Sequence, residues 1–286
     1  VTPRFFNSVS TASQYLADWW DNRDVTAADY AFFADRPVGF AHRGGALYGP
    51  NVGLENTLAA FANAVALGYR YLETDVHASK DGVPVIFHDD RLDRVTDRTG
   101  LICHQPWSEV RRAKVGGTEQ IPTLDDLLDA FPEARINVDL KIAEAVEPVW
   151  RAIKRHRAYD RVCVASFSER RLGAFRKLAG TRVATAMTPV GIAAFRLLPQ
   201  RLAMIARGQA QVLEVPPAQL LAGRTVPVVT PQLLQAAHSL GLQVHVWTID
   251  YRAEMERLLD LGVDAIHSDR IDILRDVLTE RGLWPS

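Results

Sequence analysis

Histidine, carboxylate and cationic side chains follow or interrupt several short apolar runs of this sequence. In chain order they are His42, Arg43, Glu73, Asp75, His88, Asp139 and Lys141. Carboxylates ligate hard divalent cations, histidines transfer protons near neutral pH, and Arg and Lys side chains bind anionic phosphate groups. Together these residue types predict a site that handles one phosphate group with the help of a metal ion.

The three carboxylates favour an oxygen-ligated cation. Glu73 and Asp75 stand two residues apart, so both side chains would lie on one face of a strand, and Asp139 would come from a neighbouring strand. Such a donor set is typical of Ca²⁺ or Mg²⁺, with Mn²⁺ as a third candidate. Zinc is less favoured because it prefers His or Cys ligands, and the two histidines suit proton transfer better.

Each of these residues also has an ordinary structural interpretation. A Glu-x-Asp pair on a strand is usually exposed or salt-bridged, and a single His after an apolar run is usually structural. The joint placement of all seven residues at predicted strand ends or in the adjoining hairpin favours a functional site.

Short apolar runs alternate with helical patterns from Val38 onward, which predicts βα units around a parallel sheet. The expected strands span 38–42, 71–77, 83–88, 136–141, 162–167, 183–186, 211–215, 243–248 and 265–268. The expected helices span 57–67, 123–131, 145–157, 169–178, 191–206, 231–240 and 252–261.

The third expected strand does not belong to the parallel set. Only residues 78–82 precede it, whereas parallel neighbours need a crossover of about a dozen residues or more, and Asp81-Gly82 is a hairpin signal. The strand should therefore return antiparallel and bring His88 near the carboxylates. The eight remaining strands predict an α/β fold, a (β/α)8 TIM barrel with its active site at the carboxyl ends of the strands. A small insertion, about 89–120, would follow the second barrel strand.

Residues 1–36 differ from the rest and are expected to form an N-terminal helical extension to a barrel domain at 37–286. A helix capped by Ser10 or Thr11 would be followed by an aromatic cluster of Tyr30, Phe32 and Phe33. The extension would be a lid, a membrane-surface anchor, or a segment that packs its aromatic side chains across the barrel. Acidic rather than basic polar positions favour the last of these.

Composition excludes several classes of protein. Of the 286 residues, 48% are hydrophobic and 23% are charged, as in ordinary globular proteins. The net charge of −1 disfavours nucleic acid and anionic membranes as partners. No window approaches the ~18 apolar residues of an integral membrane segment, so a cytoplasmic location is the default expectation. Nothing in the sequence indicates the oligomeric state.

Several sequence blocks, in order over roughly residues 38–273, resemble the glycerophosphodiester phosphodiesterase family. The blocks are Ala41-His42-Arg43-Gly44-Gly45, Leu54-Glu55-Asn56-Thr57 with the run to Phe61, Leu72-Glu73-Thr74-Asp75-Val76, residues 79–85, His88-Asp89 with Leu92, Arg94 and Thr96, residues 121–124, Asn137-Val138-Asp139-Leu140-Lys141, Val246-Trp247-Thr248 and residues 262–269. Several blocks in family order make a more specific signal than any one alone.

The resemblance implies metal-dependent hydrolysis of glycerophosphodiesters, small molecules of glycerophospholipid and glycerol metabolism, to sn-glycerol 3-phosphate and an alcohol. The implied roles are general acid/base catalysis for His42 and His88, metal ligation for Glu73, Asp75 and Asp139, phosphate binding for Arg43 and Lys141, an additional site role for Glu55, and a pocket wall at Trp247.

Two departures from the family pattern concern this site. Family members usually have Glu where this chain has Asp139, which is one methylene shorter. The loop between His42 and Glu55 is also a few residues longer than usual and would reshape the substrate entrance.

Other interpretations remain open at this point. The same site could act on lysophospholipids, as a lysophospholipase D does, or on another phosphodiester, and the attacking group could be water or the adjacent glycerol hydroxyl. A non-catalytic barrel that binds glycerol phosphates is less favoured, because a binding protein needs no acid/base pair of histidines. Glu214, near a predicted strand end, is a candidate substrate contact, His77 is expected to be structural, and His245 is expected to face the barrel interior below the site.

Overall fold

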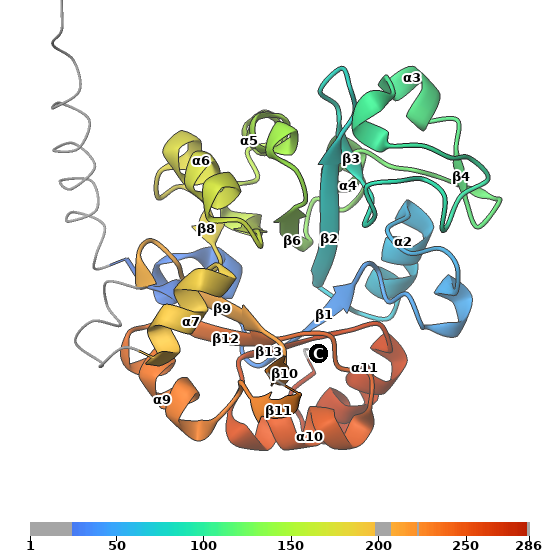
Figure 1. Ribbon diagram of the computed structural model, residues 1–286. Coiled ribbons are helices and arrows are strands. Elements are labelled where there is room, and N and C mark those ends of the chain that lie inside the picture. The colour runs from blue at the N-terminus through green and yellow to red at the C-terminus, as the bar shows by residue number, and fades with distance from the viewer. Residues whose placement is uncertain (1–24, 198–206, 222, 285–286) are drawn as a thin grey trace, which may run out of the picture.

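The computed structural model, which describes residues 25–197, 207–221 and 223–284, contains a nearly closed barrel of parallel strands surrounded by helices (Figure 1). Within these residues the eight barrel strands are β1 (Val38–His42), β2 (Tyr71–Ala78), β6 (Arg135–Leu140), β7 (Val162–Ala165), β8 (Ala184–Thr185), β9 (Val212–Val215), β12 (Gln243–Val246) and β13 (Ala265–Ser268). They are paired in the order β8-β7-β6-β2-β1-β13-β12-β9, and a parallel bridge between Ala186 and Val212 joins the two ends. The predicted (β/α)8 barrel is confirmed.

Helices cover the outside of the barrel. They are α2 (Leu58–Ala66), α4 (Leu124–Ala130), α5 (Val146–Arg155), α6 (Glu169–Ala179), α7 (Pro189–Leu197), α9 (Pro231–Ser239), α10 (Arg252–Leu261) and α11 (Ile271–Glu280). Hydroxyl side chains at Thr57, Thr123, Ser168 and Thr230 cap α2, α4, α6 and α9 by accepting a backbone N–H from the first turn. The expected helix at 191–206 begins two residues earlier, as α7, and its second half lies outside the described residues.

The antiparallel return after β2 is confirmed. Strand β3 (Pro84–Ile86) pairs with β2 in antiparallel register, with His77 opposite Val85 and Val76 opposite Ile86. The insertion that follows contains the short helix α3 (Trp107–Val110) and the two-stranded β4 (Lys114–Val115) and β5 (Glu119–Gln120). It has a small apolar core of its own that includes Leu92, Ile102, Val110 and Val115.

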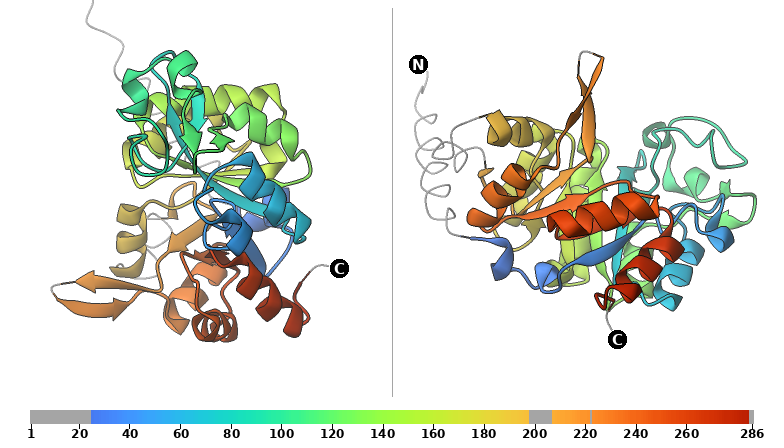
Figure 2. Two further views of the ribbon diagram at one scale, coloured as in Figure 1. Left: turned by 90° about the vertical axis from the view of Figure 1, so that its right-hand side faces the viewer. Right: turned by 90° about the horizontal axis from the view of Figure 1, so that it is seen from below.

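Outside the insertion, helix α11 and one β-hairpin were not expected from the sequence. Helix α11 buries Ile271, Leu274 and Leu278 against the barrel. Strands β10 (Ala218–Leu221) and β11 (Arg224–Pro227) form an antiparallel hairpin that projects away from the barrel (Figure 2). Within the described residues, no helix is both long and apolar enough to cross a membrane.

Aromatic side chains that precede β1 fill the end of the barrel that lies opposite the predicted site. At this end of the barrel the small side chains of Cys163, Ala184 and Ala265 belong to the same buried cluster as the rings of Phe40 and Tyr71. Phe32 and Phe33, from the 3-10 turn η2 (Ala31–Phe33), are buried in this cluster. The expected helix capped by Ser10 or Thr11 lies outside the described residues.

Candidate active site

A cavity of about 190 Å³ lies at the carboxyl ends of the barrel strands, where the predicted site residues meet. Of those residues, its lining includes His42, Arg43, Glu73, Asp75, His88, Asp139, Lys141, Glu214 and Trp247. Glu55 is not among the described residues that line the cavity; it lies beside it, in contact with Arg43. Strands from both ends of the sequence therefore contribute to one pocket.

His42 stands at the end of β1 between two carboxylates. Its Nδ1 lies 2.8 Å from Oδ1 of Asp269, and its Nε2 lies 3.8 Å from Oε2 of Glu73. Burial alone would lower the pKa of His42, but the charges of Glu73 and Asp269 outweigh it, so the pKa is raised. This histidine is therefore held in a fixed orientation and prepared to carry a proton.

The chain turns sharply after His42 and brings Arg43 into the pocket. Arg43 has φ +50°, and Gly44 and Gly45 follow with φ +86° and +89°. A Cβ atom at Gly45 would lie 2.5 Å from Cδ1 of Ile271, so the loop can pack this closely only without a side chain there. The Arg43 guanidinium is placed 3.3 Å from Oδ2 of Asp75.

Glu73 and Asp75 both point into the pocket from β2, yet their environments differ. Burial, together with the neighbouring Asp75 charge, raises the pKa of Glu73 to about 7 despite the nearby His42. Burial would also raise the pKa of Asp75, but Lys141 and Arg43 more than offset it, so that pKa is lowered. Asp75 thus stays ionised at neutral pH, while Glu73 is poised between its two forms.

Asp139 lies beside Asp75 because the two residues are direct partners in the β2–β6 register. Lys141 Nζ lies between them, 2.7 Å from Oδ1 of Asp75 and 2.8 Å from Oδ2 of Asp139. The other oxygen of Asp139, Oδ1, is buried with no hydrogen-bond partner. A buried carboxylate oxygen without a partner is costly, and a cation would satisfy it.

The carboxylates therefore suit a hard cation in their chemistry, although they are not gathered around a single point. Within the described ranges no three His, Cys, Asp or Glu side chains lie close enough to hold one metal ion. Glu73, Asp75 and Asp139 nevertheless line one cavity, and all are oxygen donors, as Ca²⁺ and Mg²⁺ prefer. Two of these carboxylates, Asp75 and Asp139, contact the positively charged Nζ of Lys141.

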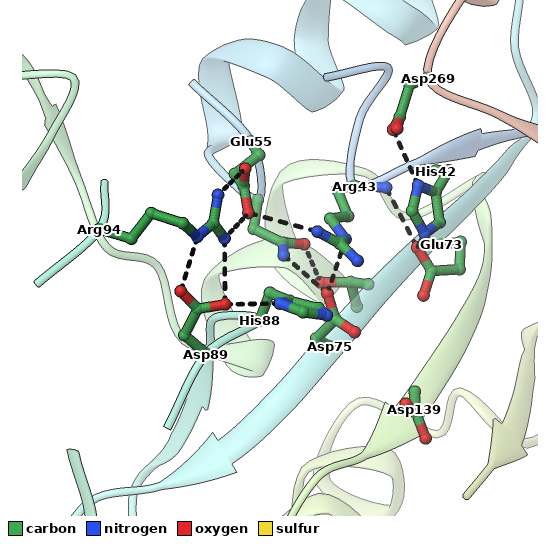
Figure 3. A network of polar contacts seen from close by, with 12 residues as sticks. His42, Arg43, Glu55, Glu73, Asp75, His88, Asp89, Arg94, Asp139 and Asp269 are labelled. Atoms are coloured by element: carbon green, nitrogen blue, oxygen red, sulfur yellow. Dashed lines mark hydrogen bonds and ion pairs between the residues drawn. The ribbon is translucent and has the colours of Figure 1, made fainter. Parts of the chain in front are cut away.

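His88 enters the pocket from the hairpin side, and a second polar network surrounds it (Figure 3). Its Nδ1 lies 2.6 Å from Oδ1 of Asp89, so both histidines expected to act as acid and base, His42 and His88, contact a carboxylate through Nδ1. Arg94 of the insertion binds Asp89 on one side and Glu55 on the other. The network thus connects His88 to a segment outside the barrel.

The opposite side of the pocket is largely apolar. Phe167, Met187, Pro189 and Trp247 line it, and the Phe167 and Trp247 rings meet edge to face with centroids 5.7 Å apart. Beneath them Glu214 accepts a hydrogen bond of 2.7 Å from Asn137 Nδ2, and burial raises the pKa of Glu214 to about 8. A ligand here would have charged groups on one side and an apolar wall on the other.

Comparisons with known proteins agree with this arrangement. The model of the glycerophosphoryl diester phosphodiesterase family matches residues 42–273. The chain belongs to this family. A probable glycerophosphodiester phosphodiesterase 2 of Mycobacterium tuberculosis is 43% identical over 232 residues, which cover 80% of this chain and 87% of that relative.

Solved structures of the glycerophosphoryl diester phosphodiesterase family show the same fold. A putative member from Silicibacter pomeroyi has a TM-score of 0.72 and 26% identity, covering 90% of this chain and 100% of that one. A phosphodiesterase of Oleispira antarctica, in complex with the product sn-glycerol-3-phosphate, has a TM-score of 0.71 and 26% identity, covering 85% and 97%. The present family member is accordingly an enzyme, a phosphoric diester hydrolase that acts on a small molecule.

Three residues of this phosphodiesterase site had no assigned role in the sequence analysis. Asp269 contacts His42, Asp89 contacts His88, and Arg94 binds Asp89. Asp89 could have been found from its position next to His88. The contact with Asp269 spans 227 positions and depends on the pairing of β1 with β13, so no local pattern could reveal it.

Proposed function

We propose that this enzyme hydrolyses glycerophosphodiesters to sn-glycerol 3-phosphate and an alcohol, with His42 and His88 as its general acid/base pair. The observation that carries the proposal is the matched geometry of the two histidines. Both line one cavity, and each contacts a carboxylate through Nδ1. A carboxylate at Nδ1 fixes the ring and its tautomer, which leaves Nε2 to exchange protons.

In this mechanism one histidine takes the proton of the attacking oxygen, which belongs to water or to the neighbouring glycerol hydroxyl. The P–O bond to the alcohol breaks, and the other histidine protonates the departing alkoxide. Such proton transfer contributes about 10²–10⁴-fold in rate for each group. In the case of the glycerol hydroxyl, a cyclic phosphate forms first and is then hydrolysed.

The phosphate of the diester would bind between Arg43 and Lys141. Both cations line the cavity, and Lys141 retains its charge because the two carboxylates beside it raise its pKa although burial lowers it. Two fixed positive charges offset the negative charge of the diester and of the attacking oxygen. The apolar wall at Trp247 and Phe167 would then face one of the two alcohol groups.

Glu73, Asp75 and Asp139 would hold one divalent cation, Ca²⁺ or Mg²⁺, with Mn²⁺ as a third candidate. The oxygen donors and the unpartnered Oδ1 of Asp139 support this proposal. When bound, the cation would add positive charge next to the phosphate. The side chain of Asp139 is one methylene shorter than that of a glutamate. We expect this difference to affect which of the three metals the site prefers.

A substrate panel tests the proposal together with its metal. The enzyme is treated with a chelator, dialysed, and assayed with glycerophosphocholine, glycerophosphoethanolamine and lysophosphatidylcholine, each with Ca²⁺, Mg²⁺, Mn²⁺ or no metal. We expect sn-glycerol 3-phosphate from the first two substrates, loss of activity after chelation, and recovery with at least one metal. Full activity after chelation would contradict the metal site, and no product under any condition would contradict the proposed function.

A further inference from the structure

Arg94 is the point at which the insertion meets the active site. Its Nε and Nη2 donate to Asp89 at 2.6 and 3.1 Å, and its Nη1 and Nη2 donate to Glu55 at 2.9 and 2.7 Å. One guanidinium therefore forms forked contacts with two carboxylates that come from different segments (Figure 3). Forked Arg–carboxylate pairs are stronger and more directional than single ion pairs.

Each of these carboxylates also contacts a residue that lines the pocket. Asp89 contacts Nδ1 of His88 at 2.6 Å, and Oε1 of Glu55 lies 3.5 Å from Nη1 of Arg43. The Glu55 contact is 2.7 Å on its Arg94 side, so Glu55 is shared unequally between the two arginines. Arg94 thus influences a proton-transfer group and a phosphate-binding group through one side chain.

We propose that Arg94 is a positioning residue that fixes His88 through Asp89 and, by holding Glu55, limits the pairing of Glu55 with the phosphate-binding Arg43. The inference rests on the roles proposed above for His88 and Arg43. Without Arg94, Glu55 would pair with Arg43 alone and partly cancel the charge meant for the substrate. Asp89 would at the same time lose the contact that sets its orientation toward His88.

The insertion fixes Arg94 in place. Leu92, two residues before Arg94, is fully buried in the core of the insertion. Val95, the residue after Arg94, packs against the same core. The Thr96 hydroxyl donates to the Leu92 carbonyl at 2.8 Å and closes the turn. The backbone at Arg94 is therefore anchored, although the side chain itself is 47% exposed.

An exposed ion pair with no further role would behave differently. Such pairs contribute little to stability, and a pair that contacts no pocket-lining residue should leave catalysis unchanged. Arg91 provides the matched control, because it lies three residues before Arg94, is 50% exposed, and pairs with Asp93 at 3.1 Å, away from the pocket-lining residues. Arg91→Ala removes an arginine of similar exposure without touching the network.

The first test compares Arg94→Ala, Arg94→Lys and Arg91→Ala in the complete enzyme with glycerophosphocholine as substrate. We expect Arg94→Ala to lower kcat/KM by about 10–100-fold, through a lower kcat and a higher KM, because small misplacements of reacting groups are costly. Arg94→Lys should recover part of the loss, since a lysine keeps the positive charge but cannot form the forked contacts of a guanidinium. Arg91→Ala should stay within about 2-fold of the unmodified enzyme.

The second test separates the two arms of the network. In a Glu55→Gln background the neutral side chain cannot cancel the charge of Arg43, so Arg94→Ala should raise KM no further yet still lower kcat. Non-additivity of this kind identifies a direct coupling. Equal losses in both backgrounds, or an Arg94→Ala enzyme indistinguishable from Arg91→Ala, would overturn the proposal. Melting temperatures of all variants show whether each is folded at the assay temperature.

A binding measurement keeps this inference distinct from the proposed function. Calorimetric titration with sn-glycerol 3-phosphate should give weaker binding to Arg94→Ala than to Arg91→Ala, and this readout needs no turnover. An enzyme that binds the phosphate but releases no product would contradict the proposed function while leaving the effect of Arg94 on Arg43 measurable. Equal affinity in the two variants would refute the Glu55 arm of the proposal.

Discussion

His42 and His88 contact their carboxylates in the same way but reach the pocket from different parts of the chain. His42 ends a barrel strand and contacts Asp269 after β13, whereas His88 follows the β3 hairpin and contacts Asp89. Their exposure also differs, since the side chain of His42 is 12% exposed and that of His88 33%. The pKa of the more enclosed of the two, His42, is raised by the charges of Glu73 and Asp269, which outweigh the effect of burial.

At this scale we predict that His42→Ala and His88→Ala each lower kcat by about 10²–10⁴-fold, because each removes a proton-transfer group. Asp269→Asn should also lower kcat while leaving KM nearly unchanged, because it alters the orientation and charge of His42 but not the phosphate contacts. Steady-state kinetics with glycerophosphocholine measure both quantities. Near-normal turnover of either alanine variant would remove that histidine from the mechanism.

Among elements, the loop that joins β1 to α2 has the strictest packing requirement. It presents Arg43 to the pocket in a left-handed backbone conformation and then passes against α11 at Gly45. Gly53, later in the same loop, has a similar φ of +81° but has no atom within 4 Å of an added Cβ. The two glycines therefore separate backbone strain from close packing.

We predict that Gly45→Ala lowers the free energy of unfolding more than Gly53→Ala does. Both substitutions place an alanine at positive φ, which costs about 1–2 kcal/mol, but only Gly45→Ala also forces a methyl group against Ile271. Overpacking of this kind adds about 1–3 kcal/mol. Denaturant unfolding of both variants gives the comparison, and equal losses would show that the contact with Ile271 relaxes freely.

Several helices and strands could be predicted from local sequence patterns alone. β1 and β13 have the predicted bounds, 38–42 and 265–268, because each is a short apolar run followed by polar residues. The antiparallel return of β3 followed from Asp81-Gly82, a purely local signal. Helix α11 had a usable signal too, since Ile271, Leu274 and Leu278 recur at helical spacing, yet it was not among the expected helices.

The sequence does not reveal which residues far apart along the chain come into contact. The site residues on β1, β2 and β6 were predictable because each is a polar residue within, or directly after, a short apolar run that is typical of a buried strand. The contact of His42 with Asp269 was not, since Asp269 reaches His42 only through the pairing of β1 with β13. Glu55 was expected in the site, but its contact with Arg43 was not. The β10–β11 hairpin likewise follows two prolines, Pro216 and Pro217, which favour a loop.

At the scale of the whole molecule, the barrel is built on a buried layer that contains aromatic and histidine rings. Phe40 stacks on His267 with centroids 4.2 Å apart, and Phe33 and Phe40 both contact the ring of His245. Burial lowers the pKa of His245 to about 4 and that of His267 well below its usual value. Both rings are therefore neutral in the folded protein at ordinary pH.

We predict that this layer makes the fold sensitive to acid. Between pH 6.5 and about 4 the unfolded chain binds a proton at His245 that the folded chain does not, so the free energy of unfolding falls as the pH falls. The contribution of this one histidine reaches about 3 kcal/mol near pH 4. Unfolding measured from pH 7 to 4 should show a smaller decrease for His245→Phe, whereas His104→Gln, at an exposed position, should match the unmodified protein. An unchanged pH dependence in His245→Phe would contradict the assignment.

Neighbouring barrel strands are paired over different numbers of positions. We expect the pocket wall to be displaced most easily where the fewest positions are paired. β2 and β6 pair over six positions from Tyr71 to Val76, whereas β8 and β9, in the described part of the chain, are joined at the Ala186–Val212 bridge and its flanking hydrogen bonds. The weakly paired junction lies opposite the β1–β2 pair in the strand order. Glu73, Asp75 and Asp139 stand on the most extensively paired strands, β2 and β6, whereas Met187 directly follows the bridge between β8 and β9. Under the proposed function, we therefore expect alcohol groups of different bulk to displace the Met187 side of the pocket and to leave the spacing of these carboxylates unchanged.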